Sequence, residues 1–538
     1  MKLWILLLST LLSAQITLEQ ISSKPPSRAK NFLIWQFLKQ DITPKEADAA
    51  FAQVQNVDTK LFLTYAKKSD SEDIRYVARC MTLKVDELLK TDDDNCLQIA
   101  ISPAKATYFT KSQRKKLVDR VFVKSTKSYL EIMSSDMSEK TLLNYTPSQV
   151  LTVMIDTGKK FRETNFNRIY SKKFMDHISK SWKISRLIDL VVMNDSMDKL
   201  QKSLMLLDGE KLTSGANFML AMNYLKHNNK KEALEYLDLS FNKAHMRIDR
   251  DKAIFWKYLI TDEKKYLKQI SLSMDINVYI LYAKEVLHMD VQNYFTGKQS
   301  SLTDVPEDKD ITDPFVWLDI RNIIKKAPRK NLFQMADHYS KQNLLPIKAF
   351  MLERAYSYKM HGYIMPYTEQ TDHMSKDDRA FMYALMRQES HFIPSAISSS
   401  YALGLMQLMP FLVDSLKRSM PNKITSYSDM FEPKNNISYA AKHLEWLDKQ
   451  LDNPLLKAYA YNAGLGFVKK YIRSGKFTDK KYEPFLSMDT MSNVESREYG
   501  KKVLANYVMY KKIMGDNISI VHLFDTLKAE NQKNRFSK

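Results

Sequence analysis

Glycine is scarce in this chain, and that scarcity constrains the fold more than any other feature. Only 11 of the 538 residues are glycine, and none precedes Gly158. Tight turns consume glycine, whereas long helices exclude it. A glycine-poor sequence of this kind predicts a mostly helical protein. Because 538 residues exceed one ordinary hydrophobic core, two or more domains are expected.

Residues 20–298 have the pattern of consecutive amphipathic helices. Between 216 and 239, two apolar stripes at helical spacing are separated by the polar break 227–230, which predicts a helical hairpin only loosely similar to a tetratricopeptide unit. A further unit follows over 251–270. Stacked hairpins bury a continuous seam and form a curved superhelix. Such a superhelix serves either as a scaffold or as a surface for a partner.

Composition changes predict the remaining domain limits. The segment 299–314 is polar and contains proline, so 299–362 is expected to be a helical linker region. Six glycines follow Gly362, and glycine-dependent loops then alternate with helices. We therefore expect a compact domain over 363–520 that carries its function in its loops, followed by a C-terminal tail over 521–538.

The N-terminus has the pattern of a signal peptide over 1–14. A basic start, Met1-Lys2, precedes an apolar run from Leu3 to Leu12 and the small residues Ser13-Ala14. An uncleaved anchor is the alternative, but the run is short for a bilayer, and no later stretch approaches the roughly 20 apolar residues that a spanning helix needs. We expect an exported protein with no transmembrane segment in its mature form.

The two cysteines bear on disulfide formation and metal binding, and the net charge bears on which polymers the protein could bind. In an exported protein, Cys80 and Cys96 are expected to form a disulfide, with two buried thiols as the alternative. Zinc-ligand spacings are absent, so no structural metal is expected. The net charge of +20 suits nucleic acid, anionic envelope polymers or simply a lysine-rich solvated surface. Since the lysines are dispersed and no DNA-binding motif occurs, no nucleic-acid partner is predicted.

One carboxylate is placed for acid/base chemistry. Ser375 and Asp378 resemble a helix start, and in the helix that follows Phe381, Leu385 and Glu389 are spaced four apart on one face. Glu389 therefore continues an apolar stripe, where a dry environment is expected to raise the pKa of its carboxyl group. A general acid needs that property. The alternative for a lone glutamate is a helix-terminal charge bonded to nearby backbone or to Arg387.

The residues around Glu389 resemble the signature of soluble lytic murein transglycosylases, in the lysozyme-like superfamily (glycoside hydrolase family 23). Three elements of that family occur in order. They are Glu389-Ser390 with Phe392, Pro394, Ser398, Ala402 and Gly404-Leu405-Met406-Gln407-Leu408-Met409-Pro410; Ala460-Tyr461-Asn462-Ala463-Gly464; and Glu495-Ser496-Arg497-Glu498-Tyr499 before Val503-Leu504. The resemblance is specific over about 365–515 and rests on analogy upstream.

The resemblance implies a role for each matching residue. Glu389 is the expected catalytic acid and base. The expected substrate-binding residues are Ser398, Gly404, Gln407, Met409, Tyr461, Asn462 and Glu495. Met409 is equally suited to core packing, Asn462 to bracing its loop, and Glu495 to the positive end of the following helix.

The same resemblance implies an all-α protein in which an α-helical superhelix, ring-forming in the larger relatives, joins a lysozyme-like catalytic domain. The expected function is a periplasmic, cofactor-free, monomeric enzyme that cleaves the MurNAc–GlcNAc bond of peptidoglycan strands, with cell-wall synthases as partners. A lysozyme-type hydrolase on the same fold and a non-catalytic wall-binding scaffold are the alternatives.

The chain departs from the family pattern at two positions. Tyr401 stands where the family usually has glycine, and Leu465 where it often has proline. A positive φ would strain tyrosine. Either the turn differs, therefore, or the tyrosine is tolerated and reaches the cleft.

Overall fold

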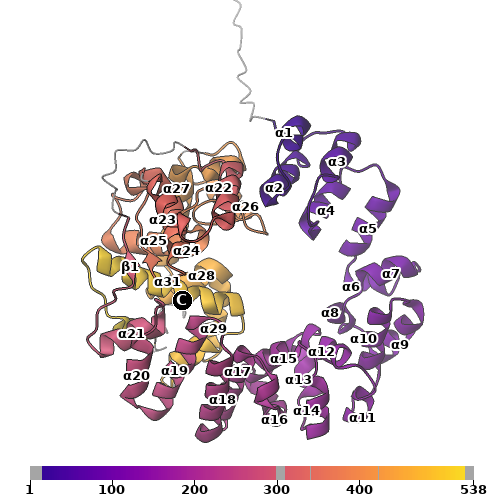
Figure 1. Cartoon of the computed structure of the whole chain (residues 1–538). Coiled ribbons are helices and arrows are strands. Elements are labelled where there is room, and N and C mark those ends of the chain that lie inside the picture. Colours follow the sequence, from indigo (N-terminus) through magenta and orange to yellow (C-terminus); the bar gives the residue numbers. More distant parts are fainter. Residues whose placement is uncertain (1–14, 298–308, 340, 422, 528–538) are drawn as a thin grey trace, which may run out of the picture. The chain divides into compact units, whose positions relative to one another are not determined.

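The computed structural model describes residues 15–297, 309–339, 341–421 and 423–527. The predicted signal peptide over 1–14, most of the predicted loop at 299–314, and the end of the predicted tail lie outside these residues. Within them the chain is mainly helical (Figure 1), and the short strands β1 (Tyr294–Phe295) and β2 (His361–Gly362) pair with each other. The prediction of an all-α fold is confirmed. No helix among the described residues is both long and apolar enough to cross a membrane.

The chain forms two compact units. Unit 1 comprises Met1–Ala78, Phe295–Tyr358 and Gly362–Lys449, and unit 2 comprises Arg79–Tyr294, Lys359–His361 and Gln450–Lys538. This division does not follow the order of the sequence. The predicted domain limits at 298, 362 and 520 stay predictions.

The helices of unit 1 come from three stretches of chain. They are α1 (Leu18–Ser22), α2 (Arg28–Phe37), α3 (Pro44–Phe51), α4 (Thr59–Ala66), α22 (Pro314–Lys326), α23 (Asn331–Asp337), α24 (Leu345–Ala355), α25 (Lys376–Ser390), α26 (Pro410–Lys417) and α27 (Pro433–Asp448), with the 3-10 turns η3 (Gln342–Leu344), η4 (Thr368–Gln370) and η5 (Tyr427–Phe431). Helix α5 (Glu72–Thr82) spans the limit between the units.

Unit 2 holds the other helices. They are α6 (Val85–Leu88), α7 (Asp94–Ala100), α8 (Pro103–Ala106), α9 (Lys111–Arg120), α10 (Lys124–Ser134), α11 (Glu139–Leu142), α12 (Pro147–Asp156), α13 (Lys159–Phe166), α14 (Lys172–Ile178), α15 (Ile184–Val192), η1 (Asp195–Met197), α16 (Asp198–Leu204), η2 (Gly209–Lys211), α17 (Ser214–Lys226), α18 (Lys230–Lys243), α19 (Arg247–Thr261), α20 (Lys264–Ser271), α21 (Val278–Val286), α28 (Pro454–Ala463), α29 (Leu465–Arg473), α30 (Phe485–Asp489), α31 (Val494–Ile513) and α32 (Ile520–Asp525).

Local sequence explains where many helices begin. The hydroxyl of Thr43 accepts the backbone N–H of Glu46, and the Glu46 carboxylate accepts the N–H of Thr43 at 2.8 Å. Thr146 and Gln149 form the same reciprocal pair at α12. These capping boxes satisfy N–H groups that a helix start leaves without partners. Glycine is not needed at such starts, which fits its scarcity.

The predicted hairpin in unit 2 is confirmed. Helix α17 ends at Lys226 and α18 begins at Lys230, as the polar break predicts. This hairpin is also bonded to the segment before it: the amide of Asn223 donates to the carbonyl of Gln201 at 2.8 Å, and the hydroxyl of Tyr236 donates to the carbonyl of Leu207 at 2.6 Å. Side-chain bonds to neighbouring helices therefore fix how successive hairpins stack.

A buried ion cluster joins the two longest of the three stretches of chain that build unit 2. The carboxylate of Asp489 accepts from Trp256 (2.8 Å), Tyr279 (2.5 Å) and Lys501 (2.8 Å), and Lys501 also pairs with Glu498 at 3.1 Å. The side chains of Asp489 and Lys501 are 0% and 1% exposed. Burial by itself lowers the pKa of Lys501, but the two carboxylates outweigh it and hold that pKa above its usual value. A buried charge that loses its partner is strongly destabilising.

The disulfide expected from the sequence is present in unit 2. Cys80 of α5 and Cys96 of α7 are bonded, with their Cα atoms 5.0 Å apart. The bridge closes a loop that contains α6, a helix of four residues that is too short to bury much core of its own. The alternative of two free thiols is wrong.

Removing this disulfide should destabilise unit 2. The sequence separation is 16 residues, and closing a loop of this size is worth about 3 kcal/mol in the unfolded chain. We expect Cys80→Ala/Cys96→Ala to lower the free energy of unfolding in urea by that amount. Reduced wild-type protein is the control and should match the double variant; equal stability of oxidised and reduced protein would contradict the expectation.

Glu498 should contribute to stability in a pH-dependent manner. Burial raises the pKa of this carboxyl group, but Lys501 and two further cations outweigh it and hold it at about 2, below the ordinary 4.5. A lowered folded-state pKa gives stability that is present above the unfolded pKa and is lost as the pH falls through the folded one. Glu498→Gln should therefore reduce the fall in unfolding free energy between about pH 4.5 and pH 2. Urea titration at a series of pH values measures this fall. Glu235→Gln, at an exposed position of α18, is the control and should leave the fall unchanged.

Candidate active site

Helix α25 carries Glu389 in its last turn. The helix begins after Ser375, whose hydroxyl accepts the backbone N–H of Asp378 at 3.1 Å. Phe381 and Leu385 are buried, and Glu389, four residues further along the same face, is half-buried. Glu389 therefore lies at the C-terminal end of the apolar face of the helix, as the spacing predicts.

The chain reverses immediately after Glu389. His391 and Phe392 both have left-handed backbones, with φ of 49° and 65°, and their N–H groups both donate to the carbonyl of Met386. Each such residue costs about 1–2 kcal/mol. Burial of the Phe392 ring, and a hydrogen bond of 3.0 Å from the Tyr367 hydroxyl to the Phe392 carbonyl, offset that cost. The turn fixes the end of the helix and the direction of the loop that follows.

Arg387 fastens the same helix to α24. Its guanidinium donates to the Glu353 carboxylate and to the carbonyl of Gly362, both at 2.9 Å, and lies 4.4 Å from the centre of the Tyr363 ring. Glu353 also accepts the N–H of Gly362 at 2.8 Å. This buried carboxylate therefore has a structural role in unit 1, and sequence reasoning did not identify it.

The loop after α25 is a small irregular hairpin. Leu403 forms antiparallel bridges with both Ile397 and Leu408. The hydroxyl of Ser398 accepts the N–H groups of Ser400 (3.2 Å) and Ala402 (2.9 Å), which shapes the turn. Ser398 keeps its hydroxyl hydrogen for a further acceptor. This predicted substrate-binding residue thus also builds the loop.

Asn436 of α27 holds the hairpin in place through side-chain hydrogen bonds. Its amide donates to the carbonyls of Leu403 (3.0 Å) and Met430 (2.8 Å) and accepts the N–H of Met406 at 2.8 Å, and the side chain is fully buried. A Cβ on Gly404 would lie 2.2 Å from this amide, so only glycine fits there. Sequence reasoning missed Asn436, since an asparagine inside a helix carries no local signal.

Gln407 and Met409 follow the hairpin. The Gln407 amide nitrogen donates to the carbonyls of Ala396 (3.0 Å) and Gly404 (2.8 Å), while no group among the described residues donates to its Oε1. Met409 is half-buried and precedes α26. Gln407 therefore holds the loop together with its nitrogen and leaves an acceptor for a ligand.

Tyr401 adopts the backbone that the family pattern assigns to glycine. Its φ is 64°, yet its side chain is only 2% exposed, against Phe32 and Trp35 of α2. Burial of an aromatic ring contributes about 1.5–3 kcal/mol, enough to offset backbone strain of roughly 1–2 kcal/mol. The turn therefore tolerates the tyrosine, and the ring is buried instead of reaching a cleft.

The other three predicted residues belong to unit 2. Tyr461 is half-buried near the end of α28, and the side chain of Asn462 accepts from the Ser496 hydroxyl at 2.5 Å and donates to Glu495 at 3.4 Å. Glu495 is exposed in the first turn of α31. The structure therefore shows the bracing contact expected of Asn462.

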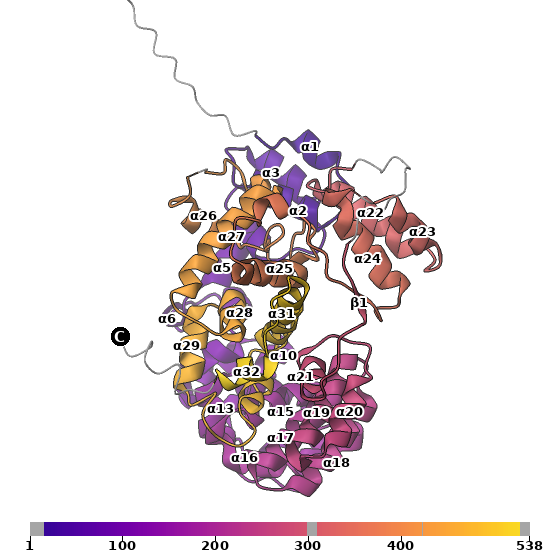
Figure 2. The ribbon, with the colours of Figure 1, turned by 90° about the vertical axis from the view of Figure 1, so that its left-hand side faces the viewer.

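Close helix packing holds this second group. Helices α28 and α31 lie side by side (Figure 2) because Gly500 allows it: a Cβ there would meet the Tyr459 ring at 2.2 Å. Leu465, the second departure from the family pattern, is the first residue of α29, where proline is favoured but not required.

The predicted residues thus form two groups. Glu389, Ser398, Gly404, Gln407 and Met409 belong to unit 1, and Tyr461, Asn462 and Glu495 belong to unit 2. Within the unit 1 group, Gln407 bonds to Gly404, three positions away, and within the unit 2 group Asn462 bonds to Glu495, 33 positions away. Their roles in binding stay predictions.

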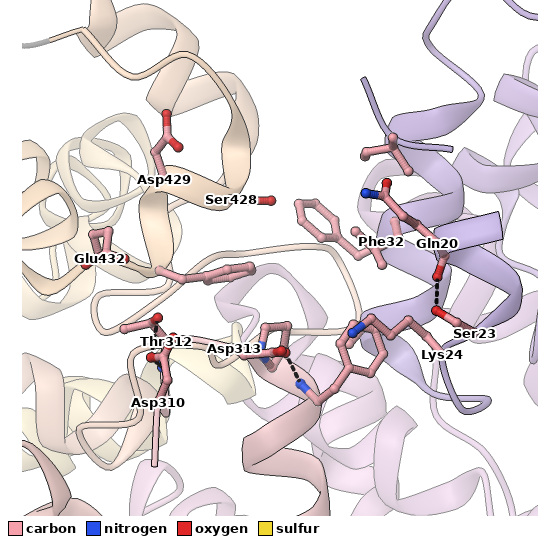
Figure 3. A pocket seen from close by; sticks show the side chains of 16 residues that line it. Gln20, Ser23, Lys24, Phe32, Asp310, Thr312, Asp313, Ser428, Asp429 and Glu432 are labelled. Carbon is pink, nitrogen blue, oxygen red and sulfur yellow. Dashed lines mark hydrogen bonds between the residues drawn. The ribbon is translucent and has the colours of Figure 1, made fainter. Parts of the chain in front are cut away.

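A separate pocket of about 590 Å³ lies in unit 1 between α1, α2, the start of α22 and η5 (Figure 3). Phe32 forms part of its wall, and its rim carries Asp310, Asp313, Asp429 and Glu432. Asp313 accepts the N–H of Phe315 at 2.7 Å and so caps α22. None of the predicted site residues lines this pocket.

Removing the Asn436 brace should loosen the loop. Asn436→Ala leaves two buried carbonyls and one N–H without partners, so we expect a loss of about 3 kcal/mol in unfolding free energy and faster hydrogen exchange at Met406. Asn435→Ala is the matched control, because its amide makes one bond, to the carbonyl of Asp429. Equal effects of both substitutions would contradict the role of Asn436.

Comparison with known proteins is consistent with the motifs. Residues 366–484 match the family model described as the transglycosylase SLT domain. A putative soluble lytic murein transglycosylase of Haemophilus influenzae is 37% identical over 142 residues, 25% of this chain and 22% of that protein. The soluble lytic murein transglycosylase of Escherichia coli K12 is 28% identical over 146 residues, 27% of this chain and 22% of that protein. The match spans about a fifth of these relatives.

Two solved structures share the fold over most of the chain. An inactive mutant of the lytic transglycosylase Slt of Pseudomonas aeruginosa has a TM-score of 0.52 at 14% identity, covering 91% of this chain and 87% of that one. A 70-kDa soluble lytic transglycosylase in complex with bulgecin A also has a TM-score of 0.52 at 14% identity, covering 94% and 89%. Residues 366–484 therefore match the transglycosylase SLT domain, in a chain whose all-α fold is similar to that of these two solved structures.

Proposed function

We propose that the protein is a peptidoglycan lytic transglycosylase with Glu389 as its acid and base. The observation that carries the proposal is the position of Glu389 inside the SLT domain. It is a half-buried carboxylate at the end of an apolar helix face, directly before a loop that is braced in one conformation.

The proposed reaction breaks the β-1,4 bond between MurNAc and GlcNAc without adding water. The Glu389 carboxyl group protonates the glycosidic oxygen, so that the GlcNAc chain leaves with that proton. The carboxylate then removes the proton of the MurNAc 6-hydroxyl as that oxygen attacks C1. The product ends in a 1,6-anhydro ring, and Glu389 is again protonated.

This scheme uses one carboxylate, whereas most glycosidases use two. Asp414 is the first acidic residue after Glu389 in the sequence, and its carboxylate accepts the Tyr427 hydroxyl at 2.8 Å. That contact supports a structural role for Asp414. In the proposal, the substrate's N-acetyl group stabilises the positive charge that develops at C1.

The loop supplies the polar groups that a neutral glycan needs. The Oε1 atom of Gln407 accepts a sugar hydroxyl or amide, and the hydroxyl of Ser398 donates to a sugar oxygen. Tyr461, Asn462 and Glu495 of unit 2 are further proposed contacts with the glycan. We propose that the enzyme is exported to the periplasm, where its +20 charge favours contact with an anionic wall.

Substitution of Glu389 tests the mechanism. Glu389→Gln should lower the release of soluble fragments from purified sacculi by at least about a hundredfold, because general acid–base catalysis contributes that much. Its circular dichroism and melting temperature should match wild type. Asp414→Asn is the control and should retain activity; survival of activity in Glu389→Gln would refute the proposed role.

Product mass separates transglycosylase from hydrolase. Mass spectrometry of wild-type digests should detect ends that are lighter by one water than the hydrolysed ends that a lysozyme releases. Hydrolysed ends, or loss of activity in Asp414→Asn, would favour a two-carboxylate hydrolase. Binding to sacculi without any release would favour a non-catalytic wall-binding protein.

A further inference from the structure

The N-terminal helices of unit 1 hold the loop that follows Glu389. The link is Tyr401, whose ring centre lies 5.6 Å from that of Phe32 and 5.3 Å from that of Trp35, both on α2. All three side chains are at most 3% exposed. Tyr401, which departs from the family pattern, is thus packed against two aromatic residues that precede it by more than 360 positions in the sequence.

Polar groups complete the enclosure. The Tyr401 hydroxyl donates to Asp58 Oδ2 at 3.3 Å, and Asp58 also caps α4 by accepting the N–H of Leu61 at 2.8 Å. The ammonium of Lys60 lies 4.1 Å from the centre of the Trp35 ring and 5.0 Å from that of Tyr401. Burial and the charge of Asp58 alike favour a neutral phenol, and they hold the pKa of Tyr401 above its usual value.

A second contact lies on the other side of Ser398. Arg28, the first residue of α2, donates from Nη1 to the carbonyl of Ile397 at 3.4 Å. Helix α2 therefore contacts the loop at residues 397 and 401. These positions lie one residue before and three residues after Ser398, a predicted substrate-binding residue. Both contacts lie within unit 1.

The anchored residue is directly coupled to the hydrogen bonds of the loop. The N–H of Tyr401 donates to the carbonyl of Ser398, and the next carbonyl, of Ala402, accepts the N–H of Ser398, both at 3.1 Å. Leu403 then exchanges backbone bonds with Leu408, beside Gln407. A shift of the Tyr401 backbone would move Ser398 and the turn that carries Gln407 together.

We propose that Tyr401 is a positioning residue through which α2 and α4 hold the loop over 397–409 in the conformation that catalysis uses. The proposal rests on the proposed function of that loop. Tyr401 itself does not touch substrate in this scheme, because its ring is enclosed by the N-terminal helices. A glycine at this position would remove the strain of the positive φ, but it would also remove the ring that packs against Phe32 and Trp35.

Three variants of the full chain separate positioning from simple core filling. Tyr401→Gly removes ring and strain together. Tyr401→Phe keeps the ring and loses only the bond to Asp58. Trp35→Ala removes the partner and leaves the loop sequence intact. Trp446→Ala, a half-exposed tryptophan of α27, is the matched control for loss of a tryptophan in unit 1.

The first readout needs no substrate. Hydrogen exchange at the amides of Ser398, Leu403 and Leu408 should accelerate roughly tenfold in both Tyr401→Gly and Trp35→Ala, and it should stay near wild type in Tyr401→Phe and Trp446→Ala. The double variant Trp35→Ala/Tyr401→Gly should exchange no faster than the single ones, because both substitutions break one contact. Unchanged exchange in Tyr401→Gly would overturn the proposal.

The second readout is turnover of wall glycan. Tyr401→Gly and Trp35→Ala should lower kcat by roughly ten- to a hundredfold with little change in KM, since a displaced loop costs alignment in the transition state. Tyr401→Phe should retain most of kcat. Loss of kcat in Tyr401→Gly with unchanged exchange would indicate direct contact with substrate and would also overturn the proposal.

The two readouts distinguish failure of this proposal from failure of the proposed function. If the wild-type protein released no fragments, the enzyme assignment would fail, while the exchange data would still decide whether α2 anchors the loop. If Tyr401→Gly did not fold, Trp35→Ala and Tyr401→Phe would decide by the same exchange comparison.

Discussion

The loop after Glu389 depends on one buried amide. Because the described residues are almost wholly helical, an irregular hairpin has few neighbouring strands to satisfy its backbone groups, and buried N–H and carbonyl groups need partners. Asn436 satisfies two carbonyls and one N–H from three positions, Leu403, Met406 and Met430. Gly404 makes this possible because any side chain there would occupy the space of the amide.

Unit 2 holds its share of the predicted site in the same manner. Asn462 bonds to Ser496 and Glu495 across two helices, and Gly500 lets those helices approach. In the same unit, Asp489 and Lys501 form a buried ion pair, and Asp489 also accepts from Trp256 of α19 and Tyr279 of α21. In unit 1, therefore, a buried amide outside the motifs braces the loop, whereas in unit 2 the motif residues Asn462 and Ser496 bond to each other.

Signals that act over a few residues were readable in advance. Capping residues, apolar spacing and the polar break at 227–230 predicted helices, and the hairpin was confirmed. Spacing along α25 placed Glu389 at the end of its apolar face. The contacts of Asn436, Arg387 and Tyr401 were missed, because each joins segments from 30 to 343 residues apart. Tyr401 was recognised as a departure, yet its environment on α2 had no counterpart in local sequence.

The sequence by itself determined the helical class, the disulfide pairing and the SLT motifs, because propensity, capping and motif spacing are properties of neighbouring residues. Only the tertiary structure decided how a tyrosine occupies a position suited to glycine, which carboxylates are structural, and how one amide braces the loop. The physical reason is that burial and hydrogen bonding depend on which distant segments meet. Tyr401 is stable with a positive φ because Phe32, Trp35 and Asp58 surround it, and their positions in the chain carry no sign of that contact.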